Sequence, residues 1–371
     1  MGKRIAIVAN STWNIFNFRL NFIQKLLEEK WKVIVVAPLD EYITYKEKFP
    51  EVHHIPLHNL NRDGNSPLKD LKLIFELRTI YKKLKPDLVV HYTHKPNIFG
   101  GIAARLSGRE SVAVVTGLGY PFLHSGLTQT VTKNLYKLTS AWHSKVIFEN
   151  ADDRQLFEEE RLIDKKQGAV VDGCGVDTQH YLPHPNGQVK DKTIFTFMGR
   201  LLYDKGIVEF VNAARLVKQR QPDTEFWVVG ELDEDNPSMV NKKDLLEWIE
   251  QGDIIYHGFL KDVKPVIAKS DCIVLPSYRE GLPRIILEGM AMGKPIITTD
   301  TAGCRQTIEE GQNGYLVQVG DAEGLSKAME TFLALPYPHR CEMGKKGRAL
   351  AEDRFNAKKI AKDLFDIVDQ V

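Results

Sequence analysis

The 371-residue sequence has few cysteines, no long apolar run and almost no net charge. Its four cysteines are widely separated and form no Cys-x-x-Cys pair, which argues against a disulfide framework or a zinc knuckle and fits a reducing cytoplasm. The longest apolar runs have the length of a strand, well below the roughly 18 residues of a membrane span. A net charge of +1 provides no general attraction to nucleic acid, so we expect no nucleic-acid partner.

The remaining composition is that of an ordinary globular protein. Apolar residues make up 43% of the chain and charged residues 27%, which argues against long disorder, collagen and coiled coil. At about 150 residues per domain, the length predicts two or three domains.

The charges are distributed unevenly along the chain. Met1–Phe148 carries 21 Lys or Arg and 11 Asp or Glu, whereas Glu149–Val371 carries 29 and 38. This asymmetry fits two domains with different partners, or an uneven but solvated surface. Leu68–Leu84 and Thr128–Lys145 combine apolar residues at helical spacing with Lys and Arg. Such helices can bind an anionic membrane surface, and they can also simply pack an apolar face on a sheet.

Short apolar runs alternate with segments of helical periodicity. This alternation predicts parallel βαβ units, and two such series predict two Rossmann-like domains with a ligand site at the carboxyl ends of their strands. A polar turn is expected after the first strand. The predicted strands are Arg4–Ala9, Lys32–Ala37, Asp87–His91, Ser111–Val115, Lys145–Glu149, Lys192–Met198, Glu225–Val229, Asp253–His257, Cys272–Leu275 and Pro295–Thr298. The predicted helices include Arg19–Lys30, Phe99–Leu106, Ile207–Gln219 and Pro283–Met292.

One loop of the second half contains a glycine followed by two cations. A predicted strand ends at Gly199, and Arg200 and Lys205 follow before a helix begins. Glycine lets the backbone approach a ligand closely, and a guanidinium fork beside an ammonium suits a diphosphate. The same residues also fit an ordinary strand–helix turn with two solvated cations.

A second loop of the same half contains two carboxylates. Glu280 precedes Gly281 and Pro283, and Glu288 lies just over one turn into the predicted helix. Proline suits the first helical turn, and the free N–H groups of a helix N-terminus favour phosphate. Carboxylates in these positions can accept hydrogen bonds from the hydroxyl groups of a sugar and a ribose.

The spacing of Glu280 and Glu288 around Gly-Leu-Pro resembles the E-x7-E motif of family 4, retaining glycosyltransferases with the GT-B fold. Gly199-Arg200 and Lys205-Gly206 resemble the diphosphate site of that family. The resemblance covers nearly the whole chain, and its N-terminal part is most similar to bacterial enzymes that add N-acetylgalactosamine to a sugar on undecaprenyl diphosphate. The further matching motifs are Gly303-Cys304-Arg305, Gly311–Gly314, Phe18-Arg19-Leu20, His94–Asn97, Gly117–Gly119 and Glu149–Asp152.

The resemblance implies an α/β architecture of the GT-B type, with two Rossmann-like domains facing each other across a cleft. The expected parts are an N-terminal acceptor-binding domain (residues 1–176), a linker (177–192), a C-terminal nucleotide-sugar-binding domain (193–356) and a final helix (357–371). We expect this final helix to pack back on the N-terminal domain.

The resemblance also implies roles for individual residues. Arg200 and Lys205 would hold the donor diphosphate and stabilise the leaving nucleotide, Glu280 would contact the donor sugar and Glu288 would bind the ribose. Retention in this family is attributed to front-face attack, in which the donor phosphate helps to take the acceptor proton. No protein nucleophile, cofactor or metal is then expected. The other implied donor contacts are Gly199, His257, Phe259, Leu260, Gly281, Leu282, Pro283 and Arg284.

The N-terminal half departs from the family at one position. Many relatives have a histidine directly after the strand that matches Val112–Val115, where this chain has Thr116 and Gly117. His94 is the nearest substitute and is a catalytic candidate, although it also fits an ordering or acceptor-loop histidine. The complete set of cleft or acceptor candidates is Asn14, Arg19, His94, Asn97, Thr116 and Gly117.

The sequence also allows a metal site and other functions. Asp233-Glu234-Asp235 follows a strand and resembles a D-x-D metal site, but Asn236-Pro237 after it indicates a turn. A sugar-nucleotide epimerase has the same two-domain architecture, but the E-x7-E pattern disfavours it. A non-catalytic nucleotide-sugar-binding protein is a further alternative, as is a glycosyltransferase with another donor and a soluble acceptor.

The sequence therefore predicts a retaining glycosyltransferase that takes a hexose or N-acetylhexosamine, best matched by N-acetylgalactosamine, from a UDP-sugar. The predicted acceptor is a lipid-diphosphate-linked sugar in surface polysaccharide or glycan assembly. The expected location is cytoplasmic, peripheral on the inner face of the cell membrane.

Overall fold

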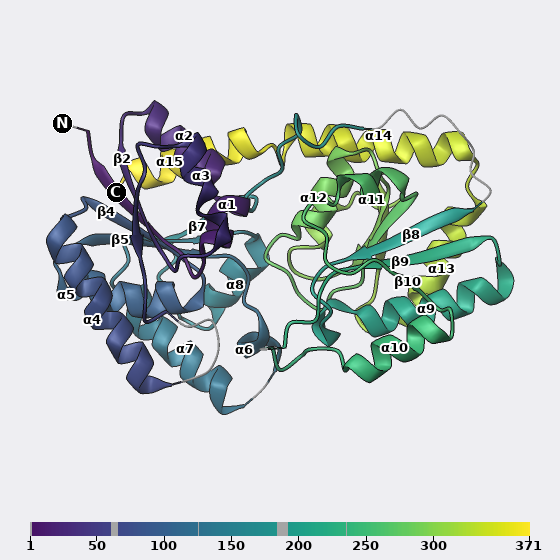
Figure 1. Ribbon diagram of the computed structural model, residues 1–371, viewed down its shortest axis with the longest axis horizontal. Coiled ribbons are helices and arrows are strands. Elements are labelled where there is room, and N and C mark those ends of the chain that lie inside the picture. The colour runs from purple at the N-terminus through teal and green to yellow at the C-terminus, as the bar shows by residue number, and fades with distance from the viewer. Residues whose placement is uncertain (1, 61–65, 125, 184–191, 235) are drawn as a thin grey trace. The chain divides into compact units, whose positions relative to one another are not determined.

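The computed structural model describes residues 2–60, 66–124, 126–183, 192–234 and 236–371 (Figure 1). Backbone contacts divide the chain into two compact units. Unit 1 contains Met1–Cys174 and Ala357–Val371, and unit 2 contains Gly175–Asn356. In each unit, a parallel β-sheet is covered by helices, as the alternating sequence pattern predicts.

The boundary between the units differs from the expected linker 177–192. The described residues that follow Gly175 pack into unit 2: Tyr181 belongs to its apolar core, and Arg348 donates to the backbone oxygens of Thr178 and Tyr181 at 2.8 and 2.6 Å. Residues 177–183 are therefore part of unit 2. Residues 184–191 of the expected linker lie outside the described residues.

The sheet of unit 1 has the strand order β3-β2-β1-β4-β5-β6-β7, and all its neighbouring strands are parallel. Its inner strands are short runs rich in β-branched residues, as expected for strands buried on both faces. The seven strands are β1 (Arg4–Val8), β2 (Lys32–Ala37), β3 (His53–Pro56), β4 (Leu88–Tyr92), β5 (Glu110–Val115), β6 (Lys145–Phe148) and β7 (Gly168–Val170), of which β3 and β7 form the edges.

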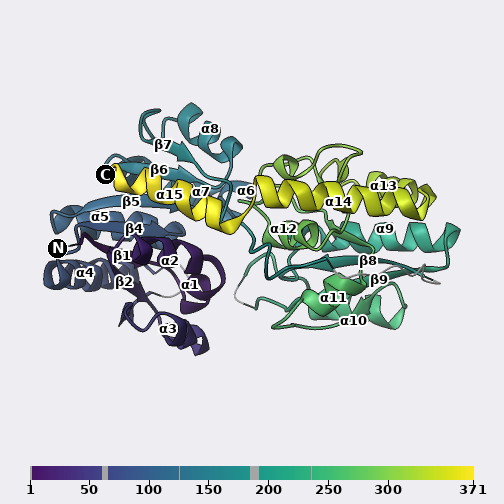
Figure 2. The ribbon, with the colours of Figure 1, turned by 90° about the horizontal axis from the view of Figure 1, so that it is seen from above.

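Helices cover both faces of this sheet (Figures 1 and 2). Ile5 and Ile7 pack against α2 and α15, whereas Ala6 and Val8 point to α4 and α5 on the other face. This alternation follows from the two-residue period of a strand. The helices are α1 (Thr12–Phe18), α2 (Leu20–Glu28), η1 (Glu41–Thr44), α3 (Tyr45–Lys48), α4 (Pro67–Leu84), the π-turn η2 (Pro96–Gly100), α5 (Gly101–Leu106), α6 (Tyr120–Leu123), α7 (Leu127–Ser140), α8 (Ala151–Glu159) and α15 (Ala357–Asp369).

The sheet of unit 2 has the strand order β10-β9-β8-β11-β12-β13, again with parallel neighbours. Its strands are β8 (Thr193–Met198), β9 (Thr224–Val229), β10 (Ile255–Tyr256), β11 (Cys272–Leu275), β12 (Ile296–Thr299) and β13 (Gly314–Val317). Its helices are η3 (Tyr203–Lys205), α9 (Ile207–Arg220), α10 (Lys242–Glu250), α11 (Lys264–Lys269), α12 (Arg284–Ala291), η4 (Arg305–Thr307), α13 (Ala322–Ala334) and α14 (Tyr337–Asp353).

The segment after the first strand corrects the expectation of a polar turn. Residues Thr12–Phe18 form helix α1, because the Ser11 side chain caps the helix by accepting a hydrogen bond from the Asn14 backbone N–H. The helix predicted at Arg19–Lys30 begins one residue later, where Arg19 ends α1 and starts α2.

The two basic amphipathic segments both form helices. Helix α4 exposes Leu68, Leu71 and Phe75. Helix α7 exposes Leu127, Val131 and Leu138, and it ends at Ser140 instead of the predicted Lys145. Helix α5 contacts both helices on the same side of unit 1 (Figure 1). Among the helices that the structure describes, none combines the length and apolar character needed to cross a bilayer.

Candidate functional site in unit 2

The loop after β8 begins at Gly199 and leads into η3 and α9. It packs so closely on neighbouring loops that two of its contacts require glycine. A Cβ atom on Gly230 would lie 1.8 Å from the Gly199 oxygen, and one on Gly206 would lie 2.0 Å from the Pro276 oxygen. Both glycines also have a positive φ, of 152° and 74°. The loops after β8, β9 and β11 are therefore held together at the carboxyl edge of the sheet, where ligands of such sheets bind.

The loop after β11 is fixed to the loop after β8 by hydrogen bonds to one carbonyl group. The backbone oxygen of Asp204 accepts hydrogen bonds from the Tyr278 backbone N–H at 2.9 Å and from the Ser277 hydroxyl at 3.2 Å. This contact brings the Lys205 ammonium to 2.5 Å from Glu280 Oε1. The structure thus places together two residues that the sequence analysis assigned to the diphosphate and the donor sugar.

Arg200 has a carboxylate partner from a third loop. Its Nη1 lies 2.5 Å from Oδ2 of Asp233, which follows β9; the Arg200 side chain is 43% exposed and that of Asp233 12%. Asp233, the first residue of the D-x-D alternative, thus forms an ion pair with the predicted phosphate-binding arginine. An incoming diphosphate would compete with Asp233 for this guanidinium group.

Glu288 is buried on α12 and has two partners. The Tyr181 hydroxyl donates to Glu288 Oε1 at 2.8 Å, and Arg284 Nε donates to the same oxygen at 2.6 Å. Burial and the nearby Glu288 charge raise the pKa of Tyr181. The sequence analysis missed Tyr181, because it lies 107 residues before Glu288 and outside every recognised motif.

The loop after β10 was predicted to meet the base. Phe259 is 50% exposed, Leu260 packs on the core, and the His257 ring centroid lies 4.7 Å from that of Trp227. Partial burial, with Lys269 as a smaller cause, lowers the pKa of His257. The Gly258 oxygen accepts from the Gly230 backbone N–H at 2.9 Å, which ties this loop to the others. An exposed aromatic ring at this position can stack on a nucleobase.

The start of α12 completes this carboxyl edge. Gly281, Leu282 and Pro283 are buried, and Pro283 caps the helix, so the helix N-terminus lies next to the Glu280 loop. Free N–H groups and the helix dipole at such an end favour a phosphate group.

Two predicted acceptor residues of unit 1 interact with each other. Arg19 donates through Nε to Asn14 Oδ1 at 3.2 Å, and both are buried. Arg19 Nη1 also lies 3.6 Å from Oε1 of Glu149, which follows β6. Burial raises the pKa of Glu149 to about 7, although Arg19 opposes this rise.

His94, the candidate catalytic histidine, is held by hydrogen bonds within unit 1. Its Nδ1 lies 2.8 Å from the Tyr136 hydroxyl, and the ring also forms a hydrogen bond with the Leu118 backbone. Burial lowers the pKa of His94 to about 4, so its ring is neutral at neutral pH. These contacts give His94 an ordering role; a catalytic role stays a prediction.

Asn97, a predicted acceptor contact, is enclosed in unit 1, and its acceptor role stays a prediction. It is 1% exposed, its Nδ2 donates to the Val114 oxygen at 3.0 Å, and its own backbone oxygen lies 3.0 Å from His143 Nε2. Asn97 therefore joins η2 to β5 inside the unit. Thr116 and Gly117 are half-buried in the loop after β5, where Gly117 has a φ of 109°.

No cluster of three or more His, Cys, Asp or Glu side chains in the described residues could hold a metal ion. Asp235 of the considered D-x-D motif lies outside those residues. The expectation that no metal or cofactor is needed stays a prediction.

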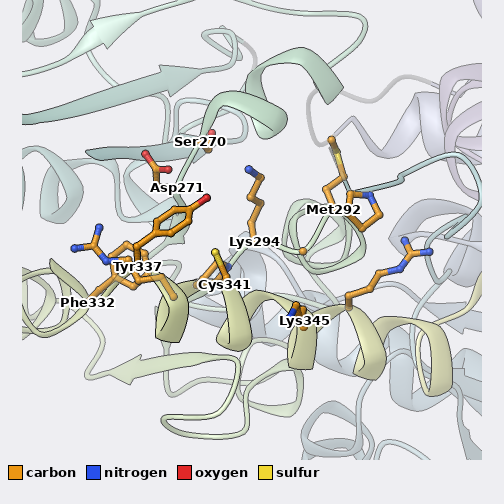
Figure 3. Close-up of a pocket in the computed structure, with 13 residues that line it drawn as sticks. Ser270, Asp271, Met292, Lys294, Phe332, Tyr337, Cys341 and Lys345 are labelled. Atoms are coloured by element: carbon orange, nitrogen blue, oxygen red, sulfur yellow. The ribbon is translucent and has the colours of Figure 1, made fainter. Parts of the chain in front are cut away.

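A cavity of about 250 Å³ lies at the opposite, amino-terminal edge of the unit 2 sheet (Figure 3). It is bordered by Asp271, which precedes β11, and by Pro295, which precedes β12. Two of its cations bond to backbone oxygens: Arg340 donates to the Leu333 and Leu335 oxygens, and Lys294 donates to the Ala268 oxygen. This cavity is separate from the carboxyl-edge site.

Two Rossmann-like units, one of them with paired cations and carboxylates at its carboxyl edge, are characteristic of nucleotide-sugar-dependent glycosyltransferases with the GT-B fold. Family models agree. Residues 4–150 match the model described as glycosyl transferase 4-like, and residues 192–334 match glycosyl transferases group 1. The chain belongs to these glycosyltransferases, and it is a hexosyltransferase.

Relatives with similar sequences come from bacterial glycan assembly. The N,N'-diacetylbacillosaminyl-diphospho-undecaprenol alpha-1,3-N-acetylgalactosaminyltransferase of Campylobacter jejuni is 29% identical over 89% of both chains. The UDP-Gal:alpha-D-GlcNAc-diphosphoundecaprenol alpha-1,3-galactosyltransferase of Escherichia coli is 28% identical over 71% of this chain and 70% of its own length.

Solved structures share the fold. Anabaena HepE in complex with UDP and glucose superimposes with a TM-score of 0.80 at 20% identity, covering 99% of both chains. Sucrose-phosphate synthase from Thermosynechococcus elongatus gives a TM-score of 0.81 at 18% identity, covering 99% of this chain and 98% of its own.

Proposed function

We propose that this chain is a retaining glycosyltransferase that moves an N-acetylhexosamine, most specifically N-acetylgalactosamine, from a UDP-sugar to a sugar linked to undecaprenyl diphosphate. The observation that carries the proposal is the carboxyl edge of unit 2, where Lys205 pairs with Glu280, Arg200 pairs with Asp233, and α12 begins and carries Glu288. The two relatives named above, whose acceptors are diphospho-undecaprenol sugars, support this choice of acceptor.

The chemistry follows from the charges of these side chains. As the bond between the anomeric carbon and the phosphate breaks, negative charge grows on the leaving diphosphate, and Arg200 and Lys205 stabilise it. Glu280 then accepts a hydrogen bond from a donor-sugar hydroxyl, and Glu288 accepts hydrogen bonds from the ribose. No described carboxylate is assigned as a nucleophile, and the leaving phosphate takes the acceptor proton.

Product analysis tests the reaction. Purified protein, UDP-N-acetylgalactosamine and farnesyl-diphospho-N-acetylglucosamine should give a disaccharide product, in the presence of EDTA, whose new linkage has the α-anomeric coupling of the donor. A β-linked product would reject retention. Loss of product with EDTA would reject metal independence and restore Asp233 as a metal ligand.

The lipid-linked acceptor also implies contact with a membrane surface. We assign this contact to the α4–α7 surface, defined as the exposed Leu68, Leu71 and Phe75 of α4 and Leu127, Val131 and Leu138 of α7. The exposed Lys69, Lys72 and Lys137 adjoin these side chains along the same helices. Apolar side chains flanked by lysines suit an anionic lipid surface.

Vesicle sedimentation tests this surface. The protein should bind vesicles with 30% phosphatidylglycerol and bind pure phosphatidylcholine vesicles much less. Phe75→Ser should weaken the binding, whereas Leu246→Ser, at a similarly exposed apolar residue on α10, should leave it unchanged. Equal binding of all three proteins would reject the assignment.

A further inference from the structure

The sheet of unit 1 has its own reversal of strand order. The chain runs outward from β1 to β2 and β3, and then returns to place β4 on the other side of β1. The loops after β1 and β4 therefore leave in opposite directions. The crevice between them is the position where doubly wound sheets bind their ligands.

Buried polar atoms without partners gather at this crevice. Asn10 Oδ1, the Tyr92 hydroxyl and Thr93 Oγ1 are buried and have no hydrogen-bond partner within the described part of the chain. Val8 of β1 pairs with His91 of β4, so Asn10 and Thr93 lie at matching positions, each two residues after this pair. Thr93 also has a φ of 74°, which a β-branched residue rarely adopts. Polar groups in such a position cost free energy unless a partner satisfies them.

A buried arginine paired with a carboxyl group lies beside these atoms. The Arg19 guanidinium carbon is 4.0 Å from the centroid of the Tyr92 ring, and its Nη1 is 3.6 Å from Glu149 Oε1. Both charged side chains are more than nine-tenths buried. Because Glu149 and Asn14 already engage the Arg19 guanidinium, this group favours a neutral, hydroxyl-rich ligand over a diphosphate.

We propose that the crevice after β1 and β4 binds the hydroxyl groups of the acceptor sugar, with Asn10 and Thr93 as direct contacts. The Arg19–Glu149 pair and Tyr92 form the polar floor that positions them. This inference rests on the proposed function, which assigns the acceptor to unit 1. It names the part of the acceptor that is recognised, and it adds residues that sequence motifs alone did not select.

The test measures binding and transfer separately in the full-length protein. The binding probes are farnesyl-diphospho-N-acetylglucosamine, farnesyl diphosphate without the sugar, and UDP. Asn10→Ala and Thr93→Val should each weaken binding of the sugar-bearing probe about fivefold and raise its KM similarly. Binding of farnesyl diphosphate and of UDP should stay unchanged. Thr331→Val, at an exposed threonine of α13, is the matched control.

The possible outcomes separate this inference from the proposed function. Unchanged binding of the sugar-bearing probe by folded variants overturns the crevice assignment, as does an equal loss for farnesyl diphosphate. Wild-type protein that binds the sugar-bearing probe without forming product overturns the function and leaves the crevice standing. Wild-type protein that binds no probe except UDP overturns both. If either variant misfolds, Tyr92→Phe, which removes one hydroxyl from the floor, replaces it and should weaken sugar binding without lowering the thermal stability.

Discussion

Replacing Asp233 with asparagine should strengthen nucleotide binding. Arg200 Nη1 lies 2.5 Å from Asp233 Oδ2, so a diphosphate must displace this carboxylate to bind the guanidinium group. An ion pair this exposed is worth about 1 kcal/mol or less, so releasing the arginine should lower the Kd for UDP by up to about fivefold. Removal of a carboxylate next to the bound diphosphate acts in the same direction.

Isothermal titration of UDP at 20 and 300 mM salt measures this effect. The gain of Asp233→Asn should be larger at low salt, because salt screens exposed charges. It should vanish in an Arg200→Ala background, since both changes act through one guanidinium group. Glu330→Gln, which removes a similar ion pair with Arg220 between α13 and α9, is the control and should have no effect. Weaker UDP binding by Asp233→Asn would refute the competition and would favour a ligand role for this carboxylate.

The remaining predictions concern both units. Lys205→Ala should reduce transfer about 100-fold or more without changing the melting temperature, and near-normal turnover by the folded variant would reject its phosphate role. Tyr181→Phe removes the hydroxyl that donates to Glu288, so UDP affinity should fall about tenfold; unchanged affinity would show that Glu288 needs no such support. Burial lowers the pKa of His143 to about 4, so between pH 6.5 and 4 the unfolded state binds more protons at this residue than the folded state does. The free energy of unfolding should therefore fall by about 3 kcal/mol through His143 as the pH is lowered from 6.5 to 4. Glu149, whose pKa is raised to about 7, has the opposite effect on stability between pH 4.5 and 7, so wild type must be compared with His143→Gln. The unfolding free energy of His143→Gln should fall less than that of wild type as the pH is lowered. Parallel curves for the two proteins would contradict the assignment.

The sequence predicted the elements with the strongest patterns. Lys32–Ala37 and Cys272–Leu275 form strands with the predicted bounds, because continuous β-branched or apolar runs can be buried on both faces. The edge strand β3 reads His-His-Ile-Pro and β7 reads Gly-Ala-Val. Such short, partly polar segments carry little signal of their own and become strands only because a neighbouring strand pairs with them.

The candidate site was predictable where its residues lie close together in the sequence. Glu280 and Glu288 are separated by fewer than three turns of helix, so their spacing is visible in the sequence. The partners Tyr181, Asp233 and Glu149 come from distant segments, and only the fold brings them to Glu288, Arg200 and Arg19. Burial is similarly invisible: Asn97 lies in a polar motif and yet is enclosed inside unit 1.

The most direct measurement of the central claim is nucleotide release from a panel of UDP- and GDP-sugars, with and without farnesyl-diphospho-N-acetylglucosamine. The account predicts release of UDP from one UDP-N-acetylhexosamine, strongly increased by the lipid acceptor and insensitive to EDTA. Release of GDP instead, or UDP release that the lipid-linked sugar does not increase, would contradict it.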